Sequence, residues 1–116
     1  MPNPIEDLTL ALREFARERD WEQFHSPKNL AISLMVEAAE VAEHFQWSSA
    51  ADDALVTEER RRAIALEIGD TLLYLARLAD VLGIDMIDAA ARKMQINAER
   101  YPVDKAFGKS AKYDRL

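Results

Sequence analysis

The sequence has no cysteine, and it has only three glycines and four prolines among 116 residues. The lack of cysteine excludes disulfides and thiolate metal sites and is typical of the reducing cytoplasm, where we expect this protein to act. Long segments without glycine or proline favour helices, because these two residues mark turns and interrupt regular structure. Alternating Val/Ile/Thr runs and Asn-Gly or Asp-Gly pairs, which would indicate strands and hairpins, are missing.

Two further absences limit the partners that the chain can have. No apolar run approaches the roughly 18 residues that a membrane span needs, and the N-terminal MPNPIEDLTL lacks the features of a secretory signal. The 15 Lys and Arg residues are outnumbered by 21 Asp and Glu, which gives a net charge of −6. We therefore expect neither a nucleic acid nor a membrane as partner, since nucleic-acid binding requires a basic face. A phosphorylated small molecule stays compatible if metal cations supply the positive charge.

The spacing of apolar residues predicts one all-α domain over residues 1–116, an antiparallel four-helix bundle. Its first helix should span about residues 5–19, and the second about residues 26–47. The third should span residues 57–82 and end at Gly83, and the fourth should begin at an N-cap, Asp85, and end before Pro102. SSAADDAL is a polar connection, and the tail 103–116 should be either mobile or part of an interface.

Acidic residues form two pairs with the same spacing. Glu37 and Glu40 are three residues apart, and after 26 intervening residues Glu67 and Asp70 repeat the spacing. Residues three apart lie on one face of a helix, so the two pairs can face each other in an antiparallel helix hairpin. Glu43 turns away from the centre of the first pair, and we expect a peripheral role for it.

The two pairs lack the basic partners that solvated acids on helices usually have four residues on, and their surroundings are apolar. Unpaired buried carboxylates would be destabilising by several kcal/mol each, and a hard divalent cation removes that cost. All-oxygen ligands favour Mg²⁺, with Mn²⁺ as a substitute. Solvated stripes of acids without a metal are the alternative.

Histidine usage separates two kinds of carboxylate metal site. Di-iron bundles need Glu-x-x-His pairs on two helices. His25 and His44 are the only histidines of the chain, and they do not supply the pair in the duplicated form that such a site needs. Four acids without histidine suit Mg²⁺, which binds phosphate oxygens and supplies an activated water.

Gly69 stands between the two acids of the second pair. Glycine in a helix interior costs about 1 kcal/mol relative to alanine, so this position needs a reason. Either something approaches the backbone closely, or the packing of the helix against its neighbour requires a small residue.

The E-x-x-E and E-x-x-D pairs on two helices resemble the MazG-like superfamily of all-α nucleoside triphosphate pyrophosphohydrolases. The blocks ERDWEQFHSPKNL, EHFQW and KMQINAERYP are similar to its dCTP pyrophosphatase branch and, with the acids, cover most of residues 14–102. The resemblance implies hydrolysis of a deoxynucleoside triphosphate, dCTP or a modified dCTP, to the monophosphate and pyrophosphate in nucleotide-pool cleansing. It also implies a homo-oligomer, a dimer or a pair of dimers.

The resemblance assigns roles residue by residue. The magnesium ligands would be Glu37, Glu40, Glu67 and Asp70, one of which orients or deprotonates the attacking water. Trp21 and Trp47 match aromatic residues of the base pocket, His25 matches a polar contact beside them, and Tyr74 matches a residue near the sugar or phosphates. In the fourth helix Lys93, Asn97 and Arg100 form a polar stripe at i, i+4 and i+7, which can contact triphosphate oxygens.

Two alternatives to dCTP hydrolysis stay open. Some mammalian members bring a histidine of the first helix to the base, and this first helix has none, so another base such as that of dUTP is possible. A non-catalytic helical oligomer whose acids bind a structural cation is the alternative of a different class. The presence of all four acids, both tryptophans and the polar stripe argues against it.

Overall fold

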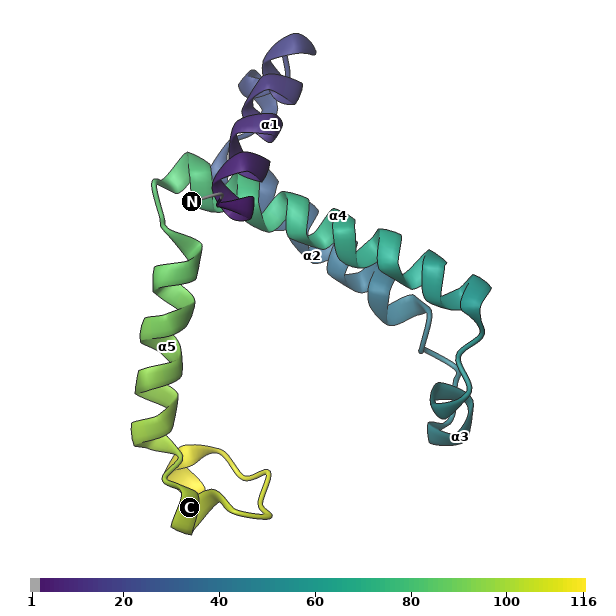
Figure 1. Ribbon diagram of the computed structural model, residues 1–116, viewed down its shortest axis with the longest axis vertical. Coiled ribbons are helices and arrows are strands. Elements are labelled where there is room, and N and C mark those ends of the chain that lie inside the picture. Colours follow the sequence, from purple (N-terminus) through teal and green to yellow (C-terminus); the bar gives the residue numbers. More distant parts are fainter. Residues whose placement is uncertain (1–2) are drawn as a thin grey trace. The chain divides into compact units, whose positions relative to one another are not determined.

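A computed structural model describes residues 3–116, and within that range it contains helices and no strand (Figure 1). The all-α prediction is thereby confirmed. The four long helices are α1 (Pro4–Glu18), α2 (Pro27–Glu43), α4 (Glu58–Leu82) and α5 (Met86–Arg100), and the short ones are α3 (Ala50–Ala54) and α6 (Val103–Ala106). Two 3₁₀ turns lie at Glu22–Phe24 and Tyr113–Arg115. The chain divides into two compact units, which join between Gly83 and Ile84.

The long helices of the first unit begin where the sequence provides caps. Asn3, Ser26 and Thr57 accept hydrogen bonds from the first turns of α1, α2 and α4. Each such cap contributes about 1 kcal/mol to helix stability. At its other end α4 stops before Gly83, as predicted, and Gly83 adopts the left-handed conformation with a φ of 67°.

The end of α2 differs from the prediction. The helix ends at Glu43, four residues before the predicted end at Trp47. The amides of His44, Phe45 and Gln46 bond to carbonyls three residues back, so the backbone tightens into turns. This tightening leads the chain into the polar connection, where α3 forms behind a capping box made by Ser49 and Asp52.

Helices α2 and α4 pack side by side and run antiparallel (Figure 1). At one end Leu30 of α2 and Tyr74 of α4 line the same cavity. At the other end Arg60, near the start of α4, donates a hydrogen bond to the carbonyl oxygen of His44. Helix α1 packs against the last turns of α4, where Arg13 forms an ion pair with Asp80.

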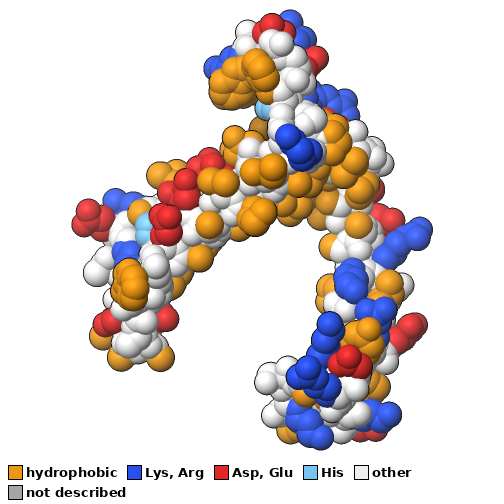
Figure 2. Space-filling model, turned by 180° about the vertical axis from the view of Figure 1, so that it is seen from behind, with side chains coloured by type: hydrophobic (Ala, Val, Ile, Leu, Met, Phe, Trp, Pro, Cys, Tyr) orange, Lys and Arg blue, Asp and Glu red, His pale blue; other side chains and the backbone are white. Residues whose placement is uncertain are grey.

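The first unit buries few side chains, and those that it buries are mostly small. Ala16, Leu30, Ala76 and Ala79 are its buried apolar residues. Alanines at these positions let the helices approach closely, but they remove little apolar surface from water. Large side chains stay outside, including Met35 at 66% and Leu66 at 74% exposure, and orange surface accordingly covers much of α2 and α4 in Figure 2.

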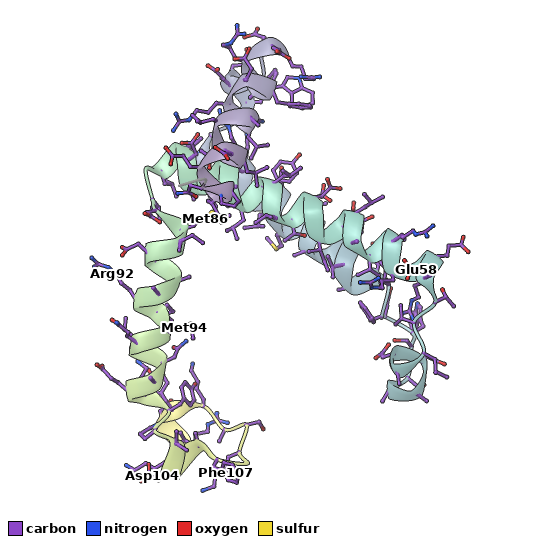
Figure 3. The ribbon with its side chains drawn as sticks, in the orientation of Figure 1. Glu58, Met86, Arg92, Met94, Asp104 and Phe107 are labelled. Atoms are coloured by element: carbon purple, nitrogen blue, oxygen red, sulfur yellow. The ribbon has the colours of Figure 1, made fainter. Side chains whose placement is uncertain are left out.

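The second unit consists of α5 and the tail. Asp85 caps α5 as predicted, and the helix ends before Pro102. Arg92 and Met94 project from opposite sides of the helix (Figure 3). The tail folds back on the end of α5, where the rings of Tyr101 and Tyr113 lie 6.1 Å apart and the guanidinium of Arg100 covers Tyr113. Within residues 3–116 no helix has both the length and the apolar content for a bilayer crossing.

The structure shows open space at Gly69, so alanine should be tolerated there. A Cβ at this position would meet no atom within 4 Å among the described residues. Gly69→Ala should therefore stabilise the helix by about 1 kcal/mol, which thermal unfolding can measure. A lower Tm would mean that something beyond this chain approaches the backbone.

Candidate metal and nucleotide site

The two acid pairs meet where α2 packs against α4. One carboxylate oxygen from each of Glu37, Glu67 and Asp70 can be chosen so that all three lie within 4.8 Å of one another. Glu40 is not part of that group of three, but it acts on the same carboxyl groups, since it raises the pKa of both Glu37 and Glu67. Red acidic side chains accordingly gather over these helices in Figure 2. The equal spacing of the pairs thus places four acids together.

The crowding of these acids changes how readily they ionise. Burial raises the pKa of Glu37, and the adjacent Glu40, Asp70 and Glu67 raise it further. The pKa of Glu67 is also raised, first by hydrogen bonding with Glu40 and then by burial. Both shifts mean that the metal-free site retains its protons to a higher pH than an isolated glutamate would.

Two oxygen atoms of the site indicate that the site suits a metal ion. Glu37 Oε2 and Glu67 Oε2 are buried and have no hydrogen-bond partner among the described residues. A buried acceptor without a partner is destabilising by about 1–3 kcal/mol. A cation bound to both atoms would satisfy them and offset the repulsion between the carboxylates. Because all donors are carboxylate oxygens, the residues fit a hard divalent cation, and the exposure of Asp70 leaves one side of the site open.

A cavity of about 210 Å³ lies next to the acids and includes Asp70 in its wall. Trp21, His25 and Tyr74 line this cavity and also an adjoining one of about 280 Å³. The structure therefore brings three of the predicted substrate-binding residues together beside one of the predicted metal ligands.

Sequence reasoning missed Phe15 and Arg77 in the same wall. Arg77 lies three residues after Tyr74 and seven after Asp70, so helical periodicity places it on the same face of α4 and could have indicated it. The side chain of Phe15 packs edge-on against Trp21, with 5.8 Å between the ring centroids. The ring is 46% exposed, and the guanidinium of Arg19 covers one of its faces at 3.6 Å from the centroid, so only the rest of the ring is available to a ligand.

Trp47 lies elsewhere in the first unit. It is 89% exposed and lines a separate cavity of about 450 Å³ with Glu43, His44 and Arg60. The 17 residues of α2 separate it from Trp21, and a helix of that length spans about 25 Å. One chain alone therefore does not place both tryptophans on the same base.

The MazG-like family model matches residues 32–116 of this chain. The chain belongs to the MazG-like family. The family recognised from the acid pairs is thereby confirmed.

Named relatives of this MazG-like chain match it over nearly its whole length. It is 42% identical to dCTP pyrophosphatase 1 of rat and of human, over 99% of this chain and 69% of each relative. Among solved structures, a pyrophosphatase from Archaeoglobus fulgidus matches with a TM-score of 0.80 and 43% sequence identity. That match covers 88% of this chain and 95% of the archaeal one.

The polar stripe of this MazG-like chain lies in the second unit. Lys93, Asn97 and Arg100 are exposed on α5. Arg100 also lies over the ring of Tyr113, at 4.6 Å from its centroid. Contact of the stripe with the phosphates of a nucleotide stays a prediction.

Replacing one buried acid should stabilise the metal-free protein. Protonation of Glu37 is favoured in the folded state, so its contribution to stability is lost as pH rises from about 4.5 through its raised pKa. Glu37→Gln cannot ionise and should therefore raise the Tm in EDTA at neutral pH, with little difference from wild type below pH 4.5.

Excess Mg²⁺ should remove or reverse this gain, because only the wild type keeps its full set of ligands. Glu59→Gln, which removes one charge from an exposed position of α4, is the control. An equal gain in both variants would show that net charge, rather than the acid cluster, causes the change.

Proposed function

We propose that this protein is a Mg²⁺-dependent enzyme that hydrolyses dCTP or a modified dCTP to the monophosphate and pyrophosphate, in cytoplasmic nucleotide-pool cleansing. The observation that carries the proposal is the group of Glu37, Glu67 and Asp70 beside the aromatic cavity. The dCTP pyrophosphatases among its relatives confirm the class predicted from the sequence, a nucleoside triphosphate pyrophosphohydrolase. Mn²⁺ should substitute for Mg²⁺, since both prefer oxygen ligands.

The acids would hold the cation between α2 and α4. Glu37 and Glu67 offer the two buried oxygens that lack partners, and Asp70 faces the cavity. When bound, the cation neutralises charge on the phosphate oxygens and polarises the phosphorus that is attacked. A carboxylate of the group that is not fully used in binding can accept a proton from the attacking water. The water oxygen bonds to phosphorus as the bridging α–β P–O bond breaks.

The cavity would bind the rest of the nucleotide. Trp21 and Phe15 offer aromatic surface for a base, and stacking on such surfaces contributes about 1–3 kcal/mol per base. Tyr74 lies one turn after Asp70 on α4 and lines the same cavity as Trp21 and Phe15, a position suited to contact with the sugar or the phosphates. The nucleotide would thus extend along α4 from its aromatic end to the acids.

We further propose that a second copy of the chain completes the site. The exposed apolar surface of α2 and α4 exceeds what an isolated domain usually leaves in water, and such surface marks protein interfaces. In a homo-oligomer, a dimer or a pair of dimers, this apolar surface would be buried between copies. Trp47 of one copy would then join the Trp21 cavity of another, and the stripe of α5 would meet the phosphates.

Two other functions compete with dCTP hydrolysis. Hydrolysis of dUTP would use the same acids and a different base contact. A non-catalytic oligomer with a structural cation would explain the acid cluster, but it would not require an aromatic cavity beside it. Pyrophosphate release from a panel of canonical and modified nucleoside triphosphates, with products identified by mass, separates the three.

Single substitutions among the acids should abolish turnover without unfolding the chain. Glu40→Gln and Asp70→Asn each remove a charge that would otherwise balance the cation, so the loss should reach at least about 100-fold in kcat. Helical circular dichroism should stay at the wild-type level. Near-normal activity in either variant would disprove the assignment of these acids to the metal, and Glu59→Gln again serves as the control.

Mixing two inactive variants tests the shared base pocket. Trp21→Ala and Trp47→Ala should each lower kcat/KM about 10- to 100-fold, the range expected for the loss of base stacking. In a dimer with two shared sites, equal mixing after dissociation and reassociation should restore about a quarter of wild-type activity. No restoration by a mixture that has exchanged subunits would place both tryptophans outside a shared pocket.

A further inference from the structure

His25 stands in the wall of both cavities beside the acids. A neutral imidazole carries one proton, on either Nδ1 or Nε2, and therefore offers one donor and one acceptor. If a donor contacts one ring nitrogen, that nitrogen must be the acceptor, and the other nitrogen then carries the proton. The contacts of His25 thus determine which hydrogen bonds it can make with a ligand.

Arg77 contacts one of these nitrogens. Its Nε–H donates to His25 Nδ1 at 3.1 Å. A guanidinium stays protonated and has no acceptor, so Nδ1 must offer its lone pair. The proton of the neutral ring then lies on Nε2. Burial lowers the pKa of His25, and the charge of Arg77 lowers it further against the opposing effect of Glu22, so the ring is neutral at pH 7.

Asp80 holds Arg77 in this orientation. Nη1 of Arg77 donates to Asp80 Oδ2 at 3.2 Å, and Arg13 of α1 donates to both oxygens of the same carboxylate, at 2.8 and 2.6 Å. The side chains of Arg77 and Asp80 are each only 11% exposed. Rotation of Arg77 away from His25 and Asp80 would leave its guanidinium, which is largely removed from water, without a carboxylate partner, and this is strongly disfavoured.

We propose that Arg77 is a positioning residue that locks His25 in its Nε2–H tautomer, so that the pocket presents a hydrogen-bond donor to the nucleotide base. The inference rests on the proposed function for the identity of the ligand. A donor on His25 Nε2 selects bases that turn an acceptor toward the ring, such as O2 or N3 of cytosine. A base that turned an N–H group there would bring two donors face to face and leave both without an acceptor.

The tautomer can be observed directly, without any activity. The chain has two histidines, so a long-range ¹H–¹⁵N correlation spectrum of the full chain contains two imidazoles, and His44→Gln identifies the signals of His25. At neutral pH the wild type should show an unprotonated Nδ1 and a protonated Nε2. Arg77→Met should show a mixture of the two tautomers.

Arg13→Met is the matched control for this spectrum. It removes the other guanidinium on Asp80 but leaves the contact between Arg77 and His25, so the tautomer should not change. A wild-type ring with its proton on Nδ1 would overturn the proposal. A spectrum of Arg77→Met identical to that of the wild type would overturn it as well.

Kinetics then test whether the locked ring faces the base. With dCTP and Mg²⁺, Arg77→Met should raise KM about tenfold and change kcat by less than about twofold, because the acids are untouched. Arg77→Lys keeps a donor and a charge and should recover most of the affinity, and Arg13→Met should leave KM near the wild-type value.

The kinetic and spectroscopic results have separate meanings. An unchanged KM in Arg77→Met, together with a changed tautomer, would overturn the role of the lock in base binding. If the wild type hydrolysed no nucleotide at all, the proposed function would fail, and the spectrum alone would still decide the tautomer lock.

Discussion

Repulsion among the acids of α2 and α4 is the constraint on which the rest of the first unit depends. Glu37, Glu40, Glu67 and Asp70 lie together because the two helices pack side by side, and no basic residue of either helix pairs with them. Apolar packing, helix caps and the ion pairs of Arg13 and Arg77 must therefore outweigh this repulsion when no metal is bound. The four acids are therefore held together in spite of their mutual repulsion, in an arrangement that suits a cation before any cation binds.

Different parts of α4 have different roles, some in holding the helices together and others in forming the candidate site. Its first half carries Arg60, which joins the end of α2, and its middle carries the acids. Its last turns carry Tyr74, Arg77 and Asp80, which build the cavity wall and join α1. Helix α4 thus fixes the spacing between two of the proposed metal ligands, Glu67 and Asp70, and its own residues in the wall of the aromatic cavity.

The sequence predicted the elements and the acids well, because both depend on local periodicity and caps. Asn3, Ser26 and Thr57 act through the first turn of their own helices, and the paired acids needed only the helical period and an antiparallel neighbour. The early end of α2 escaped prediction, since the turn at His44 depends on tertiary contacts such as that of Arg60. The hydrogen bond between Arg77 and His25 was not predicted for the same reason, because the two residues lie 52 positions apart in the sequence.

The small buried core of the first unit has a consequence for how the protein folds. Ala16, Ala76 and Ala79 bring helices together but contribute little transfer free energy, whereas the large apolar side chains lie outside. If those side chains are buried only between copies, most of the folding free energy is released on association. The stability of the folded protein then depends on its concentration, as in obligate homodimers, and dilution alone favours unfolding. The enzyme would be assembled and active only where its own concentration is sufficient.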